Sequence, residues 1–186
     1  DSAQAMAFAG SVTSLMTAVS YATSAEMARN LGAFAKFELN RTDMLRVIRN
    51  HRRATNNVVT EEYETLSVKP LGIDQKSAPA YILNAAKEEW DRALALGEIF
   101  GFRNAQTTLL APTGTIGLLM DCATTGVEPD FALVKFKKLA GGGYFKIVNE
   151  AVPVALRTLG YNEPQIDEII KFMKGHGTFV GVPVIN

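Results

Sequence analysis

The six residues from Ala111 to Ile116, Ala-Pro-Thr-Gly-Thr-Ile, have the chemistry of an anion-binding turn. Pro112 has a fixed φ and no N–H group, so it suits a turn. Gly114 lets the backbone approach a ligand closely and adopts φ values that other residues avoid. Thr113 and Thr115 add two hydroxyl donors. Together these residue types indicate a seat for a phosphate.

The flanking residues predict the backbone that would position this turn. Thr107 to Leu110 is a short β-favouring run, and Ile116 to Met120 can begin a helix. A strand that leads through a glycine turn into a helix N-terminus gathers free N–H groups and a dipole that favours anions. The same four residues, Pro-Thr-Gly-Thr, are also common in ordinary turns. The turn alone therefore leaves a phosphate seat and a bare structural turn as alternatives.

Longer stretches of the chain resemble a known family. They are Leu15–Thr17, Tyr21–Glu26, Met44–Arg53, Gly117–Cys122, Thr124–Leu139 and Gly141–Phe145. Together they closely resemble the adenosylcobalamin-dependent (class II) ribonucleotide reductases. Class I reductases share the same barrel, and the closer likeness of Gly126 to Phe131 and its continuation to the cobalamin-dependent branch is the basis for choosing that branch.

Predicted helices alternate with short apolar strands, which indicates an α/β fold, and the resemblance implies a particular one. Residues 1–186 would be the C-terminal portion of the reductase's catalytic barrel domain, supplying later strands and helices of a ten-stranded α/β barrel built around a finger loop. It also implies that Pro112, Thr113, Gly114, Thr115 and Ile116 bind the substrate's diphosphate through backbone N–H groups and threonine hydroxyls. With this context, the phosphate seat is favoured over the bare turn.

The activity implied by the resemblance is reduction of a ribonucleotide, expected to be a diphosphate, to a deoxyribonucleotide. Homolysis of adenosylcobalamin would generate a radical that passes to a cysteine outside this chain. The implied partners are the ribonucleotide, a thioredoxin-type reductant, a missing N-terminal part of the reductase and further copies of the chain. No residue here is assigned to the cobalamin, and no metal ligands are expected.

Cys122 is the only cysteine. The resembled reductases need one cysteine for the thiyl radical and a further pair for electrons, so we expect no catalytic residue in this chain. Cysteine often packs as a small buried hydrophobe, and Cys122 is expected to be structural. A single cysteine excludes an internal disulfide and fits a reducing cytoplasm.

Two other functions stay open. The chain can be the non-radical subunit of a split reductase that a second polypeptide completes. It can also be a non-catalytic module that binds a nucleotide or phosphate and has lost the radical chemistry. The neighbouring coding sequence distinguishes these functions, because it shows an upstream continuous frame, a separate cysteine-bearing partner, or neither.

Composition narrows the classes of partner. The 186 residues are 47% apolar and 20% charged, with 19 basic and 19 acidic residues, so a strongly basic nucleic-acid binder is not expected. The run from Arg46 to Arg53 is then expected to be the solvated face of an amphipathic helix. No signal peptide is expected, since no basic stretch precedes an apolar one.

Residues 2–25 carry no charge and predict a buried helix whose partners lie upstream. A membrane span is not expected, because Ser11, Thr13, Ser14, Thr17 and Ser20 interrupt the apolar run. One helical stripe holds larger apolar residues: Ala5, Phe8, Val12, Leu15, Met16 and Val19. A second stripe holds small residues that let another element approach closely: Ala3, Ala7, Gly10, Ser14 and Ala18.

Further elements follow from caps and periodicity. Helices are expected from Thr23 to Leu31, from Asn40–Asp43 onward, from Pro79 to Phe100, from Asn149 to Leu159 and from Asn162 to Lys174. Strands are expected at Tyr63–Val68, at Phe131–Phe136 with both faces covered, and at Thr178–Val182. The predicted inward residues are Met44, Leu45, Ile48, Ile82, Ala86, Trp90, Ala93, Leu94, Ile166, Ile169, Ile170 and Met173. No linker divides the chain.

Four smaller features are expected to have structural roles. Glu88 and Arg92 have the spacing of a helical ion pair. His176 is expected in a loop, and Gly141–Gly143 is expected to allow close backbone packing, since no P-loop lysine follows it. Asp121 and Glu128 are acids without a local proton-transfer partner.

Overall fold

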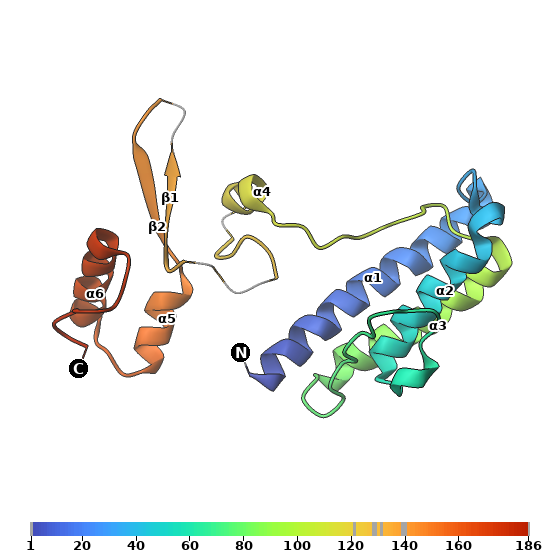
Figure 1. Cartoon of the computed structure of the whole chain (residues 1–186), viewed down its shortest axis with the longest axis horizontal. Helices are drawn as coiled ribbons and strands as arrows, with labels where there is room; N and C mark the ends of the chain where they lie inside the picture. The colour runs from blue at the N-terminus through green and yellow to red at the C-terminus, as the bar shows by residue number, and fades with distance from the viewer. Residues whose placement is uncertain (1, 121, 128–129, 131, 139–140, 186) are drawn as a thin grey trace. The chain divides into compact units, whose positions relative to one another are not determined.

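The computed structural model describes residues 2–120, 122–127, 130, 132–138 and 141–185 (Figure 1). The chain divides into two compact units, residues 1–109 and 110–186, each described here by itself. The first holds α1 (Ala3–Leu31), α2 (Phe37–Asn56), the 3-10 turn η1 (Thr60–Glu62) and α3 (Ala80–Phe100). The second holds α4 (Gly114–Leu119), β1 (Val134–Lys138), β2 (Tyr144–Val148), α5 (Ala151–Thr158) and α6 (Glu163–His176).

Helix α1 is continuous over 29 residues. It begins where Ser2 Oγ accepts the Ala5 N–H at 3.1 Å, and it ends before Gly32, whose φ is 78°. The predicted separate helix from Thr23 is wrong, although its end at Leu31 is confirmed. The buried Ser24 hydroxyl does not cap a helix, because it donates to Asn104 Oδ1 and accepts from Asn104 N at 3.0 and 2.9 Å.

The two stripes of α1 have different environments. The small residues Ala7 and Ala18 are buried, and α3 packs along α1, so the close approach predicted for that stripe is confirmed. The larger residues are mostly exposed, with Met16 57% exposed; their burial was predicted against partners outside this chain and stays a prediction. Helix α1 is long and apolar enough for a membrane span, a test that core helices also pass, and 33% of its most apolar stretch is buried.

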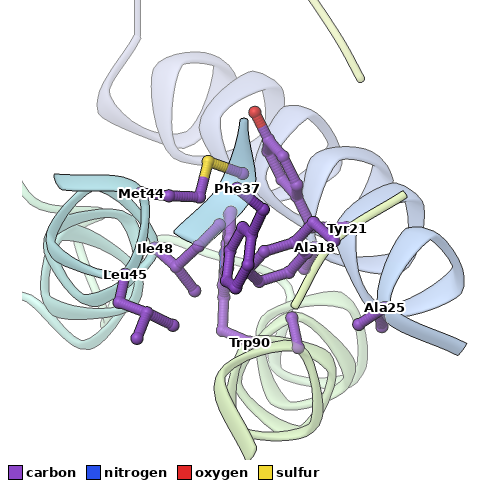
Figure 2. Close-up of a cluster of buried hydrophobic side chains, with 11 residues drawn as sticks. Ala18, Tyr21, Ala25, Phe37, Met44, Leu45, Ile48 and Trp90 are labelled. Carbon is purple, nitrogen blue, oxygen red and sulfur yellow. The ribbon is translucent and has the colours of Figure 1, made fainter. Parts of the chain in front are cut away.

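The first unit has an aromatic core between α1, α2 and α3 (Figure 2). Helix α2 begins at Phe37, earlier than predicted, because the Phe37 ring is buried against Phe34 and Phe102 at centroid distances of 5.5 and 6.2 Å. Helix α3 has the predicted bounds, with Pro79 as its N-cap and Gly101 after its end. The predicted inward residues of both helices are buried, except that Leu94 is half-buried.

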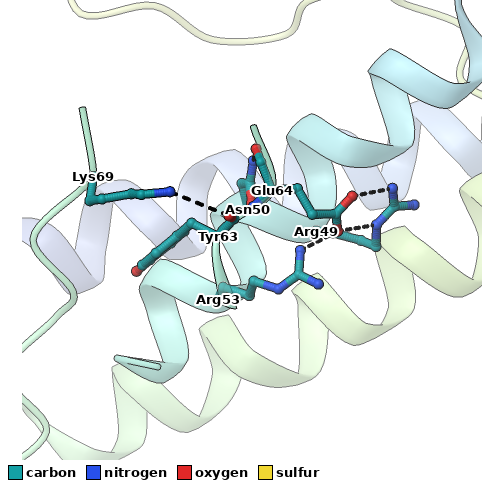
Figure 3. Close-up of polar contacts among 6 residues, drawn as sticks. All are labelled: Arg49, Asn50, Arg53, Tyr63, Glu64 and Lys69. Atoms are coloured by element: carbon teal, nitrogen blue, oxygen red, sulfur yellow. Dashed lines mark hydrogen bonds and ion pairs between the residues drawn. The ribbon is translucent and has the colours of Figure 1, made fainter. Parts of the chain in front are cut away.

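The predicted strand at Tyr63–Val68 is wrong, and this segment forms bends. The backbone of Glu64 pairs with a side chain: its N–H donates to Asn50 Oδ1, and its carbonyl accepts from Asn50 Nδ2, both at 3.0 Å. Figure 3 shows this contact beside the Arg49 and Arg53 side chains. The Asn50 amide makes the two backbone hydrogen bonds of Glu64 that a neighbouring strand would otherwise make. The segment is therefore fixed against α2 without belonging to a sheet.

The second unit contains an antiparallel hairpin in which Val134 pairs with Val148 and Lys138 with Tyr144. Its predicted coverage on both faces is wrong, since Phe136 is 58% exposed, and Phe131 lies outside the described residues. The triglycine does not serve close packing, because a Cβ on any of the three would meet no atom within 4 Å. Gly142 and Gly143 instead adopt φ values of 88° and 85°, which glycine favours.

Helices α5 and α6 lie where they were predicted, with bounds that differ by one or two residues. Asn149 Oδ1 accepts the Ala151 N–H at 2.8 Å, and Pro153 falls in the first turn of α5. Asn162 and Gln165 form a capping box for α6. Ile166, Ile169 and Met173 form part of a core with α5 and β1, and Ile170 packs against it.

The end of the second unit differs from the sequence predictions. The predicted strand at Thr178–Val182 is wrong, since the Val182 N–H donates to Phe179 O in a turn. His176 belongs to the last turn of α6 rather than to a loop, with its ring stacked on Phe172 at 3.9 Å. The described residues are thus mostly helical, with the strands confined to one hairpin, so the predicted α/β class is met in part.

Candidate phosphate site

The residues before the predicted phosphate turn do not form the expected strand. Thr107 to Leu110 has no regular structure. Its Thr108 hydroxyl instead contacts the Thr17 hydroxyl of α1 at 3.0 Å. The described residues around this segment supply no neighbouring strand. The β-favouring residues therefore have nothing to pair with, and no strand forms.

The turn itself leads directly into α4. Thr113 is the N-cap residue, with φ −87° and ψ 63°, and the helix begins at Gly114, two residues before the predicted start. Gly114 is not among the glycines with positive φ, so its backbone conformation does not require a glycine. A Cβ on Gly114 would meet no atom within 4 Å. The glycine therefore leaves open space beside the first turn of α4.

The turn is anchored by a second segment, residues 122–126. The Thr113 N–H donates to Thr125 O at 2.6 Å, and the Cys122 N–H donates to Gly117 O at 2.8 Å. Gly117 is buried, and a Cβ there would lie 3.5 Å from Thr124 O. The two segments therefore lie in direct backbone contact.

Three backbone donors of the turn have no acceptor among the described residues: the N–H groups of Gly114, Thr115 and Ile116. The first N–H groups of a helix lack intrahelical partners by geometry. Thr115 and Ile116 are exposed, and Thr113 is half-buried. The five predicted residues, Pro112 to Ile116, thus lie together at the largely exposed start of α4, beside three N–H groups that lack an acceptor among the described residues.

A cluster that the sequence predictions missed lies in the same unit. Lys135 Nζ lies 2.9 Å from Asp130 Oδ2 and donates to Ala123 O at 3.2 Å. Asn149 Nδ2 also donates to Asp130 Oδ2, at 2.9 Å. Only 5% of the Asp130 side chain and 13% of the Lys135 side chain are exposed. The one available signal was an acid and a lysine within a largely apolar stretch.

Cys122 is exposed, so the prediction that it packs as a buried hydrophobe is wrong. Its Sγ has a long contact of 3.9 Å with Met120 O. Asp121 and Glu128, the two acids noted in the sequence, lie outside the described residues. Across the described ranges, no three His, Cys, Asp or Glu residues gather in a way that could hold a metal ion.

The basic residues of α2 form internal ion pairs. Arg49 Nε and Nη2 each lie 2.7 Å from one oxygen of Glu64, and Arg53 also contacts that carboxylate (Figure 3). The predicted solvated face is thus half-buried at Arg49 and Arg53. Hydrogen bonds from Arg49, and then from Arg53, lower the pKa of Glu64 to about 2. Arginines that hold Glu64 in this way are not presented to a phosphate.

Two other side chains of the first unit have partners that were not predicted. The His51 ring stacks on Trp90 at 5.1 Å, and its burial lowers the pKa of His51. Arg92 does not pair with Glu88 as predicted, because it contacts Glu89 at 2.9 Å and Glu26 of α1. One partner, Glu89, has i,i+3 spacing within α3, and the other, Glu26, lies on a neighbouring helix, which spacing within α3 could not indicate.

Comparison with known proteins defines the family. The family model described as "Ribonucleotide reductase, barrel domain" matches residues 1–186. The chain therefore belongs to the ribonucleotide reductases, as part of their barrel domain. Over its whole length it is 60% identical to the vitamin B12-dependent ribonucleotide reductase of Agrobacterium fabrum and 57% identical to that of Bradyrhizobium diazoefficiens. Over 98% of its length it is 45% identical to the protein of the same name from Streptantibioticus cattleyicolor.

These relatives are much longer than the chain. It spans 15% of the Agrobacterium and Bradyrhizobium proteins and 28% of the Streptantibioticus protein. The resemblance stated from the sequence motifs is thereby confirmed.

Proposed function

We propose that this chain is a segment of an adenosylcobalamin-dependent ribonucleotide reductase and that it contributes the seat for the substrate's phosphates. The observation that carries the proposal is the exposed turn at the start of α4. Three N–H groups there lack an acceptor among the described residues, while the Thr113 N–H anchors the turn to Thr125 O. A fixed turn with free donors can hold an anion without reorganising, and the family supplies the anion's identity.

The substrate in this proposal is a ribonucleoside diphosphate. The N–H groups of Gly114, Thr115 and Ile116 and the hydroxyls of Thr113 and Thr115 bind its phosphate oxygens, and Pro112 restricts the entry to the turn. Binding the phosphates holds the ribose in one place relative to the cysteine that carries the thiyl radical, which lies in another part of the complete enzyme. The contribution of this chain is therefore positioning.

The complete enzyme in this proposal extends beyond residues 1–186, which form a C-terminal portion of a ten-stranded barrel. It works in the cytoplasm, receives electrons from a thioredoxin-type protein and associates with further copies of itself. The relatives' names give vitamin B12 dependence, and we extend that dependence to this protein.

Adenosylcobalamin supplies the initiating radical in such an enzyme. The phosphate turn is assigned to the substrate, and we assign no residue here to the cofactor.

The test is nucleotide binding by the full-length reductase with Thr113→Val and Gly114→Val combined. Valine at 114 fills the open space beside the free N–H groups, and valine at 113 removes a hydroxyl. Losing one hydrogen bond to a charged group costs about 1.5–3 kcal/mol, so we expect affinity for the diphosphate to fall about tenfold to a hundredfold. Affinity for the nucleoside without phosphates should stay unchanged.

Unchanged affinity for the diphosphate would refute the phosphate seat. Two comparisons complete the experiment: diphosphates against triphosphates as substrates, and activity with and without adenosylcobalamin. Equal turnover without the cofactor would refute the class assignment, and a preference for triphosphates would correct the proposed substrate.

A further inference from the structure

Lys135 connects the hairpin to the segment that anchors the phosphate turn. Its ammonium group contacts Asp130 Oδ2 at 2.9 Å and donates to Ala123 O at 3.2 Å. An ammonium has three donors, so one lysine can bridge a carboxylate and a carbonyl at the same time. Because the side chain is largely buried, solvent screens both contacts less than at the surface.

The carbonyl that Lys135 holds lies two residues before the one that anchors the turn. Ala123 O accepts from Lys135, and Thr125 O accepts from the Thr113 N–H at 2.6 Å. Between them, the Thr124 hydroxyl donates to Gly126 O at 2.8 Å and keeps this stretch compact. A displacement of Ala123 is thus transmitted to Thr113 over a very short length of chain.

The other end of the connection is fixed to the hairpin and α5. Asp130 Oδ2 accepts from Asn149 Nδ2 at 2.9 Å, the Asn149 N–H donates to Leu133 O at 2.9 Å, and Asn149 Oδ1 accepts from Ala151 at the start of α5. Asn149 is itself buried. The carboxylate that pairs with Lys135 is therefore held in place by hydrogen bonds to the hairpin and α5.

We propose that Lys135 is a positioning residue for the phosphate turn. It holds residues 122–126 in place and so fixes Thr113 and the N–H groups that follow it. This role rests on the proposed function of the turn, and it is independent of any contact between Lys135 and the nucleotide. A charged donor suits the role because its hydrogen bonds are stronger than those of a neutral amide.

The experiment compares two variants of the full-length reductase, Asp130→Asn and Asp130→Asn with Lys135→Met. Both lack the ion pair, and neither leaves a buried carboxylate without its cation. They differ in the Lys135 ammonium, and so in its hydrogen bond to Ala123 O and in the buried positive charge that Asp130→Asn leaves without a carboxylate. Hydrogen exchange is followed without nucleotide in peptides that cover residues 111–126 and, as an internal reference, α6. The KM and kcat for the diphosphate are measured on the same samples.

We expect exchange in residues 111–126 to be about tenfold faster in the double variant than in Asp130→Asn, the factor expected for one lost charged hydrogen bond. Exchange in α6 should be equal in the two variants. We also expect KM to rise about tenfold while kcat changes less than about twofold, because the loss affects binding more than the radical step.

Equal exchange of residues 111–126 in the two variants would overturn the role of Lys135. The phosphate-binding role of the turn would not be affected by that result, because the combined Thr113→Val and Gly114→Val variant tests it separately. Acceleration of α6 to the same extent would also overturn it, because Lys135 would then stabilise the whole unit. Faster exchange of the turn with an unchanged KM would overturn the phosphate assignment itself, and with it the part of Lys135 in substrate binding.

Discussion

Trp90 Nε1 donates a hydrogen bond of 2.9 Å to Ser14 Oγ, within the packing of α3 against α1. The Ser14 hydroxyl lies 2.6 Å from Thr55 Oγ1, which donates to His51 O at 3.1 Å. The directions are consistent, since each hydroxyl accepts from one partner and donates to the next. Three helices of the first unit are thus joined by one chain of hydrogen bonds beside an aromatic core.

Ser14→Ala is expected to lower the free energy of unfolding by about 1–3 kcal/mol, because it leaves the buried Trp90 N–H without its acceptor. The measurement is urea unfolding of the 186-residue chain, followed by the fluorescence of Trp90, its only tryptophan. Ser20→Ala is the control. The Ser20 hydroxyl bonds only to Met16 O of its own helix, so the change should stay within about 0.5 kcal/mol. Equal effects of the two substitutions would contradict this account.

Gly97→Ala and Gly175→Ala should change stability in opposite directions. A Cβ at Gly97 would lie 2.2 Å from the Phe102 ring, which is fully buried, so we expect overpacking to cost about 1–3 kcal/mol. A Cβ at Gly175 of α6 meets no atom within 4 Å, so alanine should add about 0.5 kcal/mol through its helix propensity. Thermal unfolding of both variants decides this, and a stabilised Gly97→Ala would show that Phe102 moves aside freely.

The pair of Arg49 with Glu64 predicts a dependence of stability on pH. Its hydrogen bonds lower the pKa of Glu64 from 4.5 to about 2. Because the folded pKa is below the unfolded one, this stability is fully present above pH 4.5 and is lost as the pH falls toward 2. With 32% of the Glu64 side chain exposed, screening reduces the contribution to about 1–2 kcal/mol.

Glu64→Gln should therefore lower the free energy of unfolding by about 1–2 kcal/mol at pH 7, and its difference from the wild type should shrink between pH 4.5 and pH 2. Urea unfolding at three pH values measures this. Arg46→Met is the control, since Arg46 pairs at 3.0 Å with an Asp43 side chain that is 65% exposed, and its loss should cost less than about 0.5 kcal/mol. A difference that persists undiminished at low pH would argue for packing as the source of the stability.

Cys122→Ser should leave turnover of the full-length reductase within about twofold of the wild type, a small change on the free-energy scale of kinetics. The thiol is exposed and contacts Met120 O, with no base among its described partners. A maleimide should modify Cys122 in the folded protein. Loss of turnover with retained folding would show that this thiol takes part in electron or radical transfer.

The helices could be predicted from the sequence because their signals are local. The capping box at Asn162 and the bounds of α3 at Pro79 and Gly101 depend on neighbouring residues alone. The Thr23 signal failed because α1 is continuous from Ala3 to Leu31, and the Glu26 carboxylate that would complete a capping box contacts Arg92 of α3 instead. The strand predicted at Tyr63 failed for the same kind of reason, since the Asn50 amide replaces a neighbouring strand.

The candidate site itself stays a prediction. Local chemistry and family likeness point to Pro112 to Ile116, and the structure places these residues at the start of α4. The anchoring of Thr113 by Thr125 and the connection through Lys135 to Asp130 could not be predicted. They depend on contacts between residues brought together by folding, and a charged side chain in a strand gives no sign of where its partner lies.

The hairpin of β1 and β2 leaves two strand edges open in the described part of the chain. In the described part of the chain each strand pairs with the other alone, so both outer edges present unpaired N–H and C=O groups, beside the exposed rings of Phe136 and Phe145. Open edges are templates for strand addition, and a two-stranded ribbon by itself is only marginally stable in water. In the longer protein, either edge of this ribbon is therefore a place where a further strand can add by backbone hydrogen bonds.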